Sequence, residues 1–136
     1  MSNPDVDIRT RINNAFARCD LLDNYKVLVY VKNAGNYKKF MNECAEKFRK
    51  NNATISENEK NMLVARFKNG SQFLVLVADD SVVGEKCHML LVDHEIREKQ
   101  LMELSPHIEV YKDENNGVGI LNPNPIYLDF DYMVFR

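Results

Sequence analysis

Apolar residues recur along the chain with two spacings, one typical of helices and one typical of buried strands. From Asp5 to Leu22, and again from Tyr37 to Phe48, they return every three or four positions. This spacing predicts two amphipathic helices. The polar pairs Asp23-Asn24 and Asn51-Asn52 interrupt the pattern and end the two helices.

Continuous apolar runs of strand length lie between and after these helices. Residues 26–31 and 87–92 are almost wholly apolar, as expected for strands that are buried on both faces of a sheet. Residues 62–67 and 72–78 flank Lys68-Asn69-Gly70-Ser71, in which Asn-Gly supplies the positive φ angles of a hairpin turn. The pattern therefore predicts two buried strands and one antiparallel hairpin.

The remaining segments have weaker signals. Residues 52–61 are mostly polar and are expected to form a connecting loop or a short helical turn, and residues 79–86 form a loop. Residues 94–104 are expected to form a short helix that ends at Ser105-Pro106, because proline disfavours helical geometry in the residue before it. Residues 108–111 are strand-like, and the aromatic segment 126–135 is expected to be an edge or closing strand.

Strands interleaved with helices indicate an α/β protein. With 136 residues, of which 45% are hydrophobic, the chain is long enough for one core and short for two. We therefore expect a single domain over residues 1–136. The fold class is a three-layer sandwich with a mainly parallel central sheet and one antiparallel hairpin.

Charge and cysteine usage narrow the function classes. The formal net charge is −2, so there is no overall excess of the kind found in nucleic-acid coat proteins or DNA mimics. The three cysteines lack CxxC spacing, which argues against a disulfide framework and a zinc site and favours a reducing cytosol. No apolar run approaches the roughly 20 residues of a membrane span. We expect a cytoplasmic protein with no membrane contact.

The segment from Met62 to Ile96 carries an ordered set of features. The Asn69-Gly70-Ser71 hairpin is followed by Asp79-Asp80, by Gly84 and then by an apolar strand that runs into Asp93-His94-Glu95. This order resembles the central ATPase core of phage terminase large subunits and related helicases, in which an "NGS" hairpin precedes a Walker B strand that ends in acidic residues. The helix, strand and helix upstream extend the resemblance over about the first hundred residues. It implies a P-loop NTPase-like scaffold, and phage origin with location in the host cytoplasm.

The chain departs from this family at the positions that hold nucleotide. No GxxxxGK[ST] loop occurs in the sequence, and the first strand and phosphate loop of the family are expected to be absent. At the acidic pair of the family, Asp93 matches the first position, His94 stands at the second and Glu95 is displaced by one. A displacement by one residue turns the side chain away. The resemblance thus implies a scaffold without ATP hydrolysis and without a cofactor.

The acidic strand end admits two interpretations. Asp93 and Glu95 are candidate oxygen ligands for a divalent metal, with Asp79 or Asp80 completing a metal or nucleotide site. Alternatively, Asp93 caps the following helix and Glu95 lies in its first turn. The histidines lack partners at metal-ligand spacing, and the cysteines are expected to be buried packing residues.

A basic stretch and an aromatic tail are the candidate partner-binding surfaces. The stretch from Lys32 to Lys68 contains nine basic and four acidic residues, so it could contact phosphate groups. Tyr37 in this stretch either stacks on a base or packs into the core. The aromatic tail is either a cover for the core or an exposed docking edge. The candidate partner-binding residues are Lys38, Lys39, Lys47, Arg49, Lys50, Tyr127, Phe130 and Tyr132.

Three functions follow from these features. The first is a non-catalytic protein that binds a protein partner, with host machinery or host defence as the partner class that a phage origin suggests. The second is a nucleic-acid-binding accessory module that uses residues 32–68. The third is a metal- or nucleotide-binding enzyme or sensor that uses Asp93 and Glu95.

Overall fold

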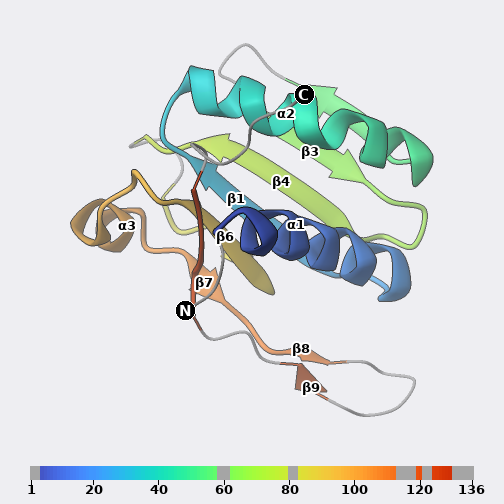
Figure 1. Cartoon of the computed structure of the whole chain (residues 1–136). Coiled ribbons are helices and arrows are strands. Elements are labelled where there is room, and N and C mark those ends of the chain that lie inside the picture. The colour runs from blue at the N-terminus through green and yellow to red at the C-terminus, as the bar shows by residue number, and fades with distance from the viewer. Residues whose placement is uncertain (1–3, 58–61, 80–82, 113–118, 121–123, 130–136) are drawn as a thin grey trace.

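A six-stranded sheet forms the centre of the protein (Figure 1). The computed structural model describes residues 4–57, 62–79, 83–112, 119–120 and 124–129. The strands lie in the order β10 (Ile126–Leu128), β6 (Met89–Asp93), β1 (Lys26–Val31), β4 (Gln72–Val77), β3 (Met62–Arg66) and β2 (Thr54–Glu57).

The central part of the sheet is parallel. β1 pairs in parallel with β4 on one side and with β6 on the other, and β10 pairs in parallel with β6. The remaining two strands are antiparallel, because β3 pairs with β4 through the expected hairpin and β2 then pairs with β3. The prediction of a mainly parallel sheet with an antiparallel hairpin is confirmed, and β1 is its central buried strand.

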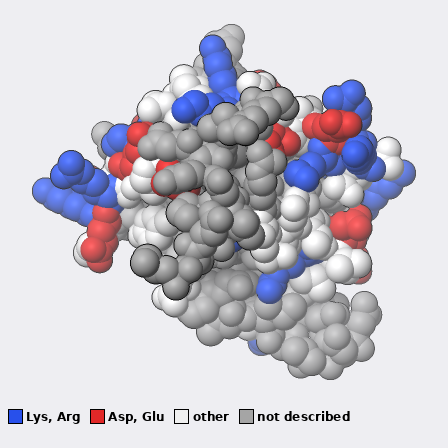
Figure 2. Space-filling model, viewed as in Figure 1, with Lys and Arg blue, Asp and Glu red and all other residues white. Residues whose placement is uncertain are grey.

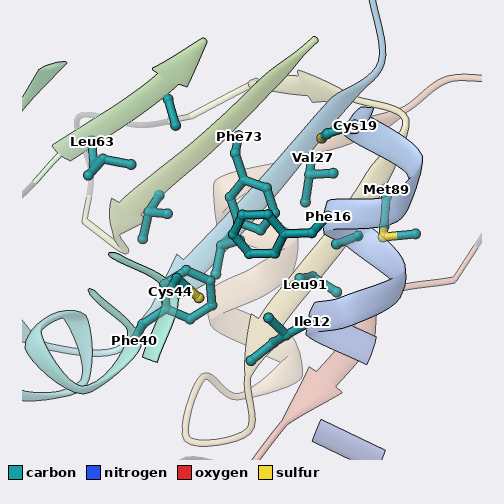
Figure 3. Close-up of a cluster of buried hydrophobic side chains, with 14 of the residues drawn as sticks. Ile12, Phe16, Cys19, Val27, Phe40, Cys44, Leu63, Phe73, Met89 and Leu91 are labelled. Carbon is teal, nitrogen blue, oxygen red and sulfur yellow. The ribbon is translucent and has the colours of Figure 1, made fainter. Parts of the chain in front are cut away.

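Helices cover both faces of the sheet, so the elements lie in three layers. On one face α1 (Pro4–Leu21) and α2 (Ala34–Lys50) enclose a core in which Phe16 stacks on Phe73 at a ring distance of 4.9 Å (Figure 3). On the other face α3 (Glu98–Leu104) packs its Leu101 and Leu104 against alternate residues of β1, β4 and β6. Residues 27–31 of β1 are all buried, alternately on one face of the sheet and on the other, which explains why these five residues are apolar.

Several expected boundaries were wrong. Residues 52–61 are not simply a loop, because Thr54–Glu57 add β2 to the sheet edge. The run 87–92 is divided at His88 into β5 (Lys86–Cys87), which pairs with β7 (His107–Ile108), and β6. The expected helix 94–104 starts only at Glu98, after a turn.

The C-terminal part is only partly described. β8 (Tyr111–Lys112) and β9 (Gly119–Ile120) form a short antiparallel pair, so the strand-like segment 108–111 belongs to two elements, β7 and β8. Of the predicted strand 126–135, β10 accounts for 126–128 and residues 130–136 lie outside the described residues. Within the described part, no helix combines the length and the apolar character that crossing a membrane requires.

Candidate functional site

The candidate site lies where β1 and β6 end side by side. From the end of β1 the chain passes into α2 on one face of the sheet, whereas from the end of β6 it passes through a turn to α3 on the other face. Adjacent parallel strands whose connections diverge in this way open a crevice at their carboxyl ends, which is where α/β proteins place ligands. Tyr30 of β1 is in register with Val92 of β6, so the residues that follow them meet at the carboxyl ends of these two strands.

Asp93, the last residue of β6, is a fully buried polar group at these strand ends. Its side chain has an exposed fraction of 0%. Oδ2 accepts from the backbone N–H of Lys32 at 2.8 Å and from Nδ2 of Asn36 at 2.6 Å, and Oδ1 accepts from the backbone N–H of Glu95 at 3.0 Å. The carboxylate therefore joins the end of β6, the β1–α2 connection and the first turn of α2. Three N–H donors compensate for the loss of water around its charge.

Asn36 brings the two predicted acidic residues together. Its Nδ2 donates to Asp93 and also to Oε2 of Glu95 at 3.0 Å, while its backbone N–H is capped by Oδ1 of Asn33 at 2.8 Å. Glu95 itself is exposed. The expectation that Asp93 caps the helix after β6 was wrong in its detail, because α3 begins at Glu98 and Asp93 instead binds the turn before it.

Lys32 and His94 flank this carboxylate cluster. The Lys32 ammonium donates to Oε1 of Gln100 at 2.9 Å, which ties the β1–α2 connection to α3. His94 binds the edge strand β10, since its backbone N–H donates to the Leu128 carbonyl at 2.7 Å. Its Nδ1 lies 3.6 Å from Asp93 Oδ1 and its Nε2 lies 3.5 Å from Asp129 Oδ1. His94, at the second position of the resemblance, thus joins two strand ends.

The hairpin turn of the resemblance lies at the opposite end of the strands, where β1 and β4 begin. Nδ2 of Asn69 donates to the carbonyls of Cys19, Asp20 and Leu22 at 2.8, 3.2 and 3.0 Å, and Ser71 Oγ donates to the Leu22 carbonyl at 2.5 Å. These carbonyls lie at or just after the C-terminal end of α1, and the last carbonyls of a helix have no partners within the helix. The Asn-Gly-Ser turn therefore fastens the end of α1 to the sheet, and the structure does not bring it near Asp93.

His88 has a structural position at this same end of the strands, beside the start of β1. Its Nδ1 accepts from the backbone N–H of Lys26 at 2.9 Å, and its ring packs against Tyr25 and Tyr111, each at a ring distance of 5.3 Å. Burial lowers the pKa of His88 below 6.5, an effect to which Lys26 adds and which Glu109 opposes. The neutral imidazole is the form that fits this hydrogen bond.

The basic candidate residues lie along α2. The helix carries five basic and two acidic residues, with Lys47, Arg49 and Lys50 in its last turn, and Lys38 and Lys39 are exposed nearer its start. Figure 2 shows several Lys and Arg side chains at the right of the molecule, the side on which α2 ends in Figure 1. A pair between Lys50 and Glu46 at 3.8 Å neutralises part of this charge.

The aromatic candidates have separate positions. The prediction that Tyr37 packs into the core is confirmed, since it is 4% exposed and burial raises its pKa to about 12. Tyr127 is 44% exposed on β10. Phe130 and Tyr132 lie outside the described residues.

The cysteines are buried, as their packing role predicts. Burial raises the pKa of Cys19 and of Cys87 to about 12, and it also raises that of Cys44. A thiolate is the reactive form of cysteine, so these positions are unsuited to nucleophilic chemistry at neutral pH.

The donors available for a metal are few at the described positions. No three His, Cys, Asp or Glu residues among them come close enough to hold a metal ion. Asp79 is exposed after β4 and Asp80 lies outside the described residues. Asp93 and Glu95 share an amide donor through Asn36, and their role as metal ligands stays a prediction.

Sequence reasoning missed Asn36. The residue lies about one helical turn before Phe40 and two before Cys44, so it is a polar member of the apolar stripe that α2 turns toward the sheet. A polar residue on the buried face in the first turn of a helix is a signal for a buried hydrogen bond. Its partner 57 residues away has no counterpart in the local pattern.

Comparison of the chain with known family models, curated proteins and solved structures finds no match.

Proposed function

We propose that this protein is a non-catalytic binding protein, built on an ATPase-like scaffold of the terminase and helicase type and acting on a protein partner. Phage origin, with host machinery or host defence as the partner class, belongs to the same proposal. The order of motifs from the hairpin to Asp93 suggests the scaffold. The hydrogen bonds made by Asp93 and by the start of α2 support the loss of catalysis.

The hydrogen bonding of Asp93 is the observation that carries the proposal. A carboxylate that holds a metal-bound water network needs oxygen lone pairs directed at solvent or at the metal. Both oxygens of Asp93 instead accept N–H groups from three segments of the chain, and the side chain is fully buried. In this arrangement Asp93 stabilises the fold and is poorly placed to coordinate an ion.

The start of α2 supports the same conclusion. Helix N-termini bind phosphate through their free backbone N–H groups. Here Asn33 Oδ1 already accepts the N–H of Asn36, and Asp93 Oδ2 accepts the N–H of Lys32. These internal acceptors occupy positions that a nucleotide phosphate would need, and the 136 residues contain no GxxxxGK[ST] loop to replace them.

Two measurements test this function. The first is thermal unfolding with millimolar ATP or GTP and Mg²⁺, together with phosphate release, for which we expect neither stabilisation nor turnover because a bound ligand would raise the melting temperature by mass action. The second is affinity capture from the cell that makes the protein, followed by reconstitution of the complex from purified components. Turnover of ATP, or failure of every captured protein to bind when purified, contradicts the proposal.

A nucleic-acid-binding module is the second candidate, and the net positive charge of α2 favours it. Because Tyr37 is buried, binding would rely on phosphate contacts without base stacking by that residue. Affinity for single-stranded DNA that falls steeply with added salt would support this candidate. Absence of binding at low salt would exclude it.

A further inference from the structure

Among the strands that the structure describes, β2 is an outer strand with no partner on its far side. In the described part of the sheet β2 pairs with β3, and all four of its residues are exposed. An edge strand has backbone N–H and C=O groups that point away from its neighbour and are free to pair with another chain. β2 is short and ends in the charged Glu57, but it contains neither proline nor lysine, the two residues that most directly block such pairing.

The opposite edge of the sheet differs. There Nη1 of Arg11 reaches from α1 to the carbonyl of Tyr127 on β10 at 3.4 Å. A side chain of the protein thus already engages a backbone acceptor of that strand. Of the two edges, β2 is the better template for an added strand.

An apolar side chain stands in the middle of this edge. Ile55 is in register with Ala65, which is buried in the core beneath α1 and α2, so Ile55 points to the same face of the sheet. It is 41% exposed. A strand added beside β2 would place one side chain against Ile55 and would remove part of this apolar surface from water.

Basic residues flank the first half of β2. The last turn of α2 holds Lys47, Arg49 and Lys50, and a short turn joins it to β2, with Ala53 N–H donating to the Phe48 carbonyl at 3.0 Å. On the other face, the exposed Arg66 is in register with Thr54. An added strand would therefore meet cations from both sides of the sheet at one of its ends.

We propose that β2 accepts an extended, acidic segment of a partner protein as a seventh strand of the sheet. This inference rests on the proposed function and names the surface and chemistry of the partner. Backbone hydrogen bonds supply affinity, Ile55 supplies an apolar contact, and the flanking cations select Asp and Glu by charge-assisted hydrogen bonds.

Selection from a displayed library of random dodecapeptides on the immobilised full-length protein tests the inference. We expect enriched peptides to alternate β-branched or aromatic residues with Asp or Glu. Methylation of alternate backbone nitrogens in an enriched peptide is expected to weaken binding at least about tenfold, because an added strand depends on its main-chain hydrogen bonds. A helix or loop that bound through side chains alone would not follow this alternating pattern.

Matched variants locate the bound peptide. Ile55→Glu is expected to weaken peptide binding at least about tenfold, because it removes the apolar contact and repels acidic peptides. The control is Val83→Glu, which changes an apolar residue that is 56% exposed and lies outside β2, and it should leave peptide binding unchanged. The double change Arg49→Gln and Lys50→Gln is expected to reduce the preference for acidic peptides. The control pair Lys86→Gln and Lys99→Gln keeps that preference. Circular dichroism confirms that each variant is folded.

Four outcomes overturn the inference. They are no enrichment, enrichment of neutral or basic peptides, equal binding to Ile55→Glu, and tighter binding of single-stranded DNA than of any enriched peptide. A wild-type dimer that Ile55→Glu converts to a monomer would also overturn it, because a second copy would then occupy the edge. Each of these results leaves the ATP and capture measurements to decide the proposed function separately.

Discussion

The side-chain amide of Asn36 donates to Asp93 Oδ2 at 2.6 Å and joins the first turn of α2 to the end of β6. The two residues are 57 positions apart in the chain. Their bond lies at the carboxyl ends of β1 and β6, where the connections to α2 and α3 diverge, which is the place at which α/β proteins commonly bind ligands. The same amide also donates to Glu95, so both acidic residues at the end of β6 accept a hydrogen bond from within the protein.

Removal of this amide should destabilise the protein. Asn36→Ala leaves the buried Asp93 carboxylate without one of its donors, and we expect a loss of about 2 kcal/mol in the free energy of unfolding. Asn36→Asp should cost more, because it adds a third carboxylate to the cluster. Urea denaturation measures both. Asn42→Ala, at an exposed position of α2, is the control and should change stability by less than about 0.5 kcal/mol.

Two glycines with similar backbone angles allow steric contact to be separated from conformational strain. Gly70 has φ +85° and Gly84 has φ +82°, so alanine at either position carries the cost of a left-handed conformation, about 1 to 2 kcal/mol. A Cβ at Gly70 would also collide with the side chain of Asn24, whereas one at Gly84 would meet open space. We expect Gly70→Ala to lower stability by at least about 1 kcal/mol more than Gly84→Ala. Equal losses in urea denaturation would show that Asn24 moves aside freely.

Stability should fall on acidification because of His88. Its pKa in the folded state is lowered, chiefly by burial, whereas the unfolded chain takes up the proton near the ordinary value of 6.5. The unfolded state therefore binds more protons as the pH falls through 6.5, and the stability contributed by neutral His88 is present above that pH and lost below it. Protonation of Nδ1 would also break the bond from Lys26 N–H.

Urea denaturation at about pH 7.5 and about pH 5.5 tests this dependence. The difference between the two values should be smaller in His88→Gln than in the wild type. His107→Gln, at an exposed position, should keep the wild-type difference. An NMR titration of the His88 ring with a midpoint above 6.5 would contradict the argument.

The cysteines should resist thiol reagents in the native protein. Because burial raises the pKa of Cys19 and of Cys87 to about 12, almost no thiolate is present at neutral pH, and Cys44 is fully buried. We expect a disulfide reagent such as Ellman's reagent to label the folded protein slowly and to label all three thiols rapidly in urea. Rapid labelling of one thiol without denaturant would reveal a local opening at that residue.

Elements with strong local periodicity could be predicted from sequence. The stripes of α1 and α2, the apolar run of β1 and the Asn-Gly turn between β3 and β4 each bear their signal within the segment itself. β2 could not be predicted, because its four residues are exposed and lack the alternation of a half-buried strand. It is a strand because it pairs with β3, the outer strand of the hairpin.

The candidate site could be predicted only in part. The position of Asp93 at a strand end followed from the apolar run before it, but its three donors come from Lys32, Asn36 and Glu95. Likewise, the Asn69-Gly70-Ser71 turn was visible in the sequence, and its binding to the end of α1 was not.

The pattern of apolar and polar residues by itself determined the main helices and strands and the α/β class, because periodicity reports which face of an element is buried. Only the tertiary structure decided the strand order, the placing of the hairpin turn and Asp93 at opposite ends of the strands, and the position of β2 as an outer strand of the described sheet. These depend on contacts between residues far apart in the chain, and such contacts follow from the packing of whole elements on one sheet.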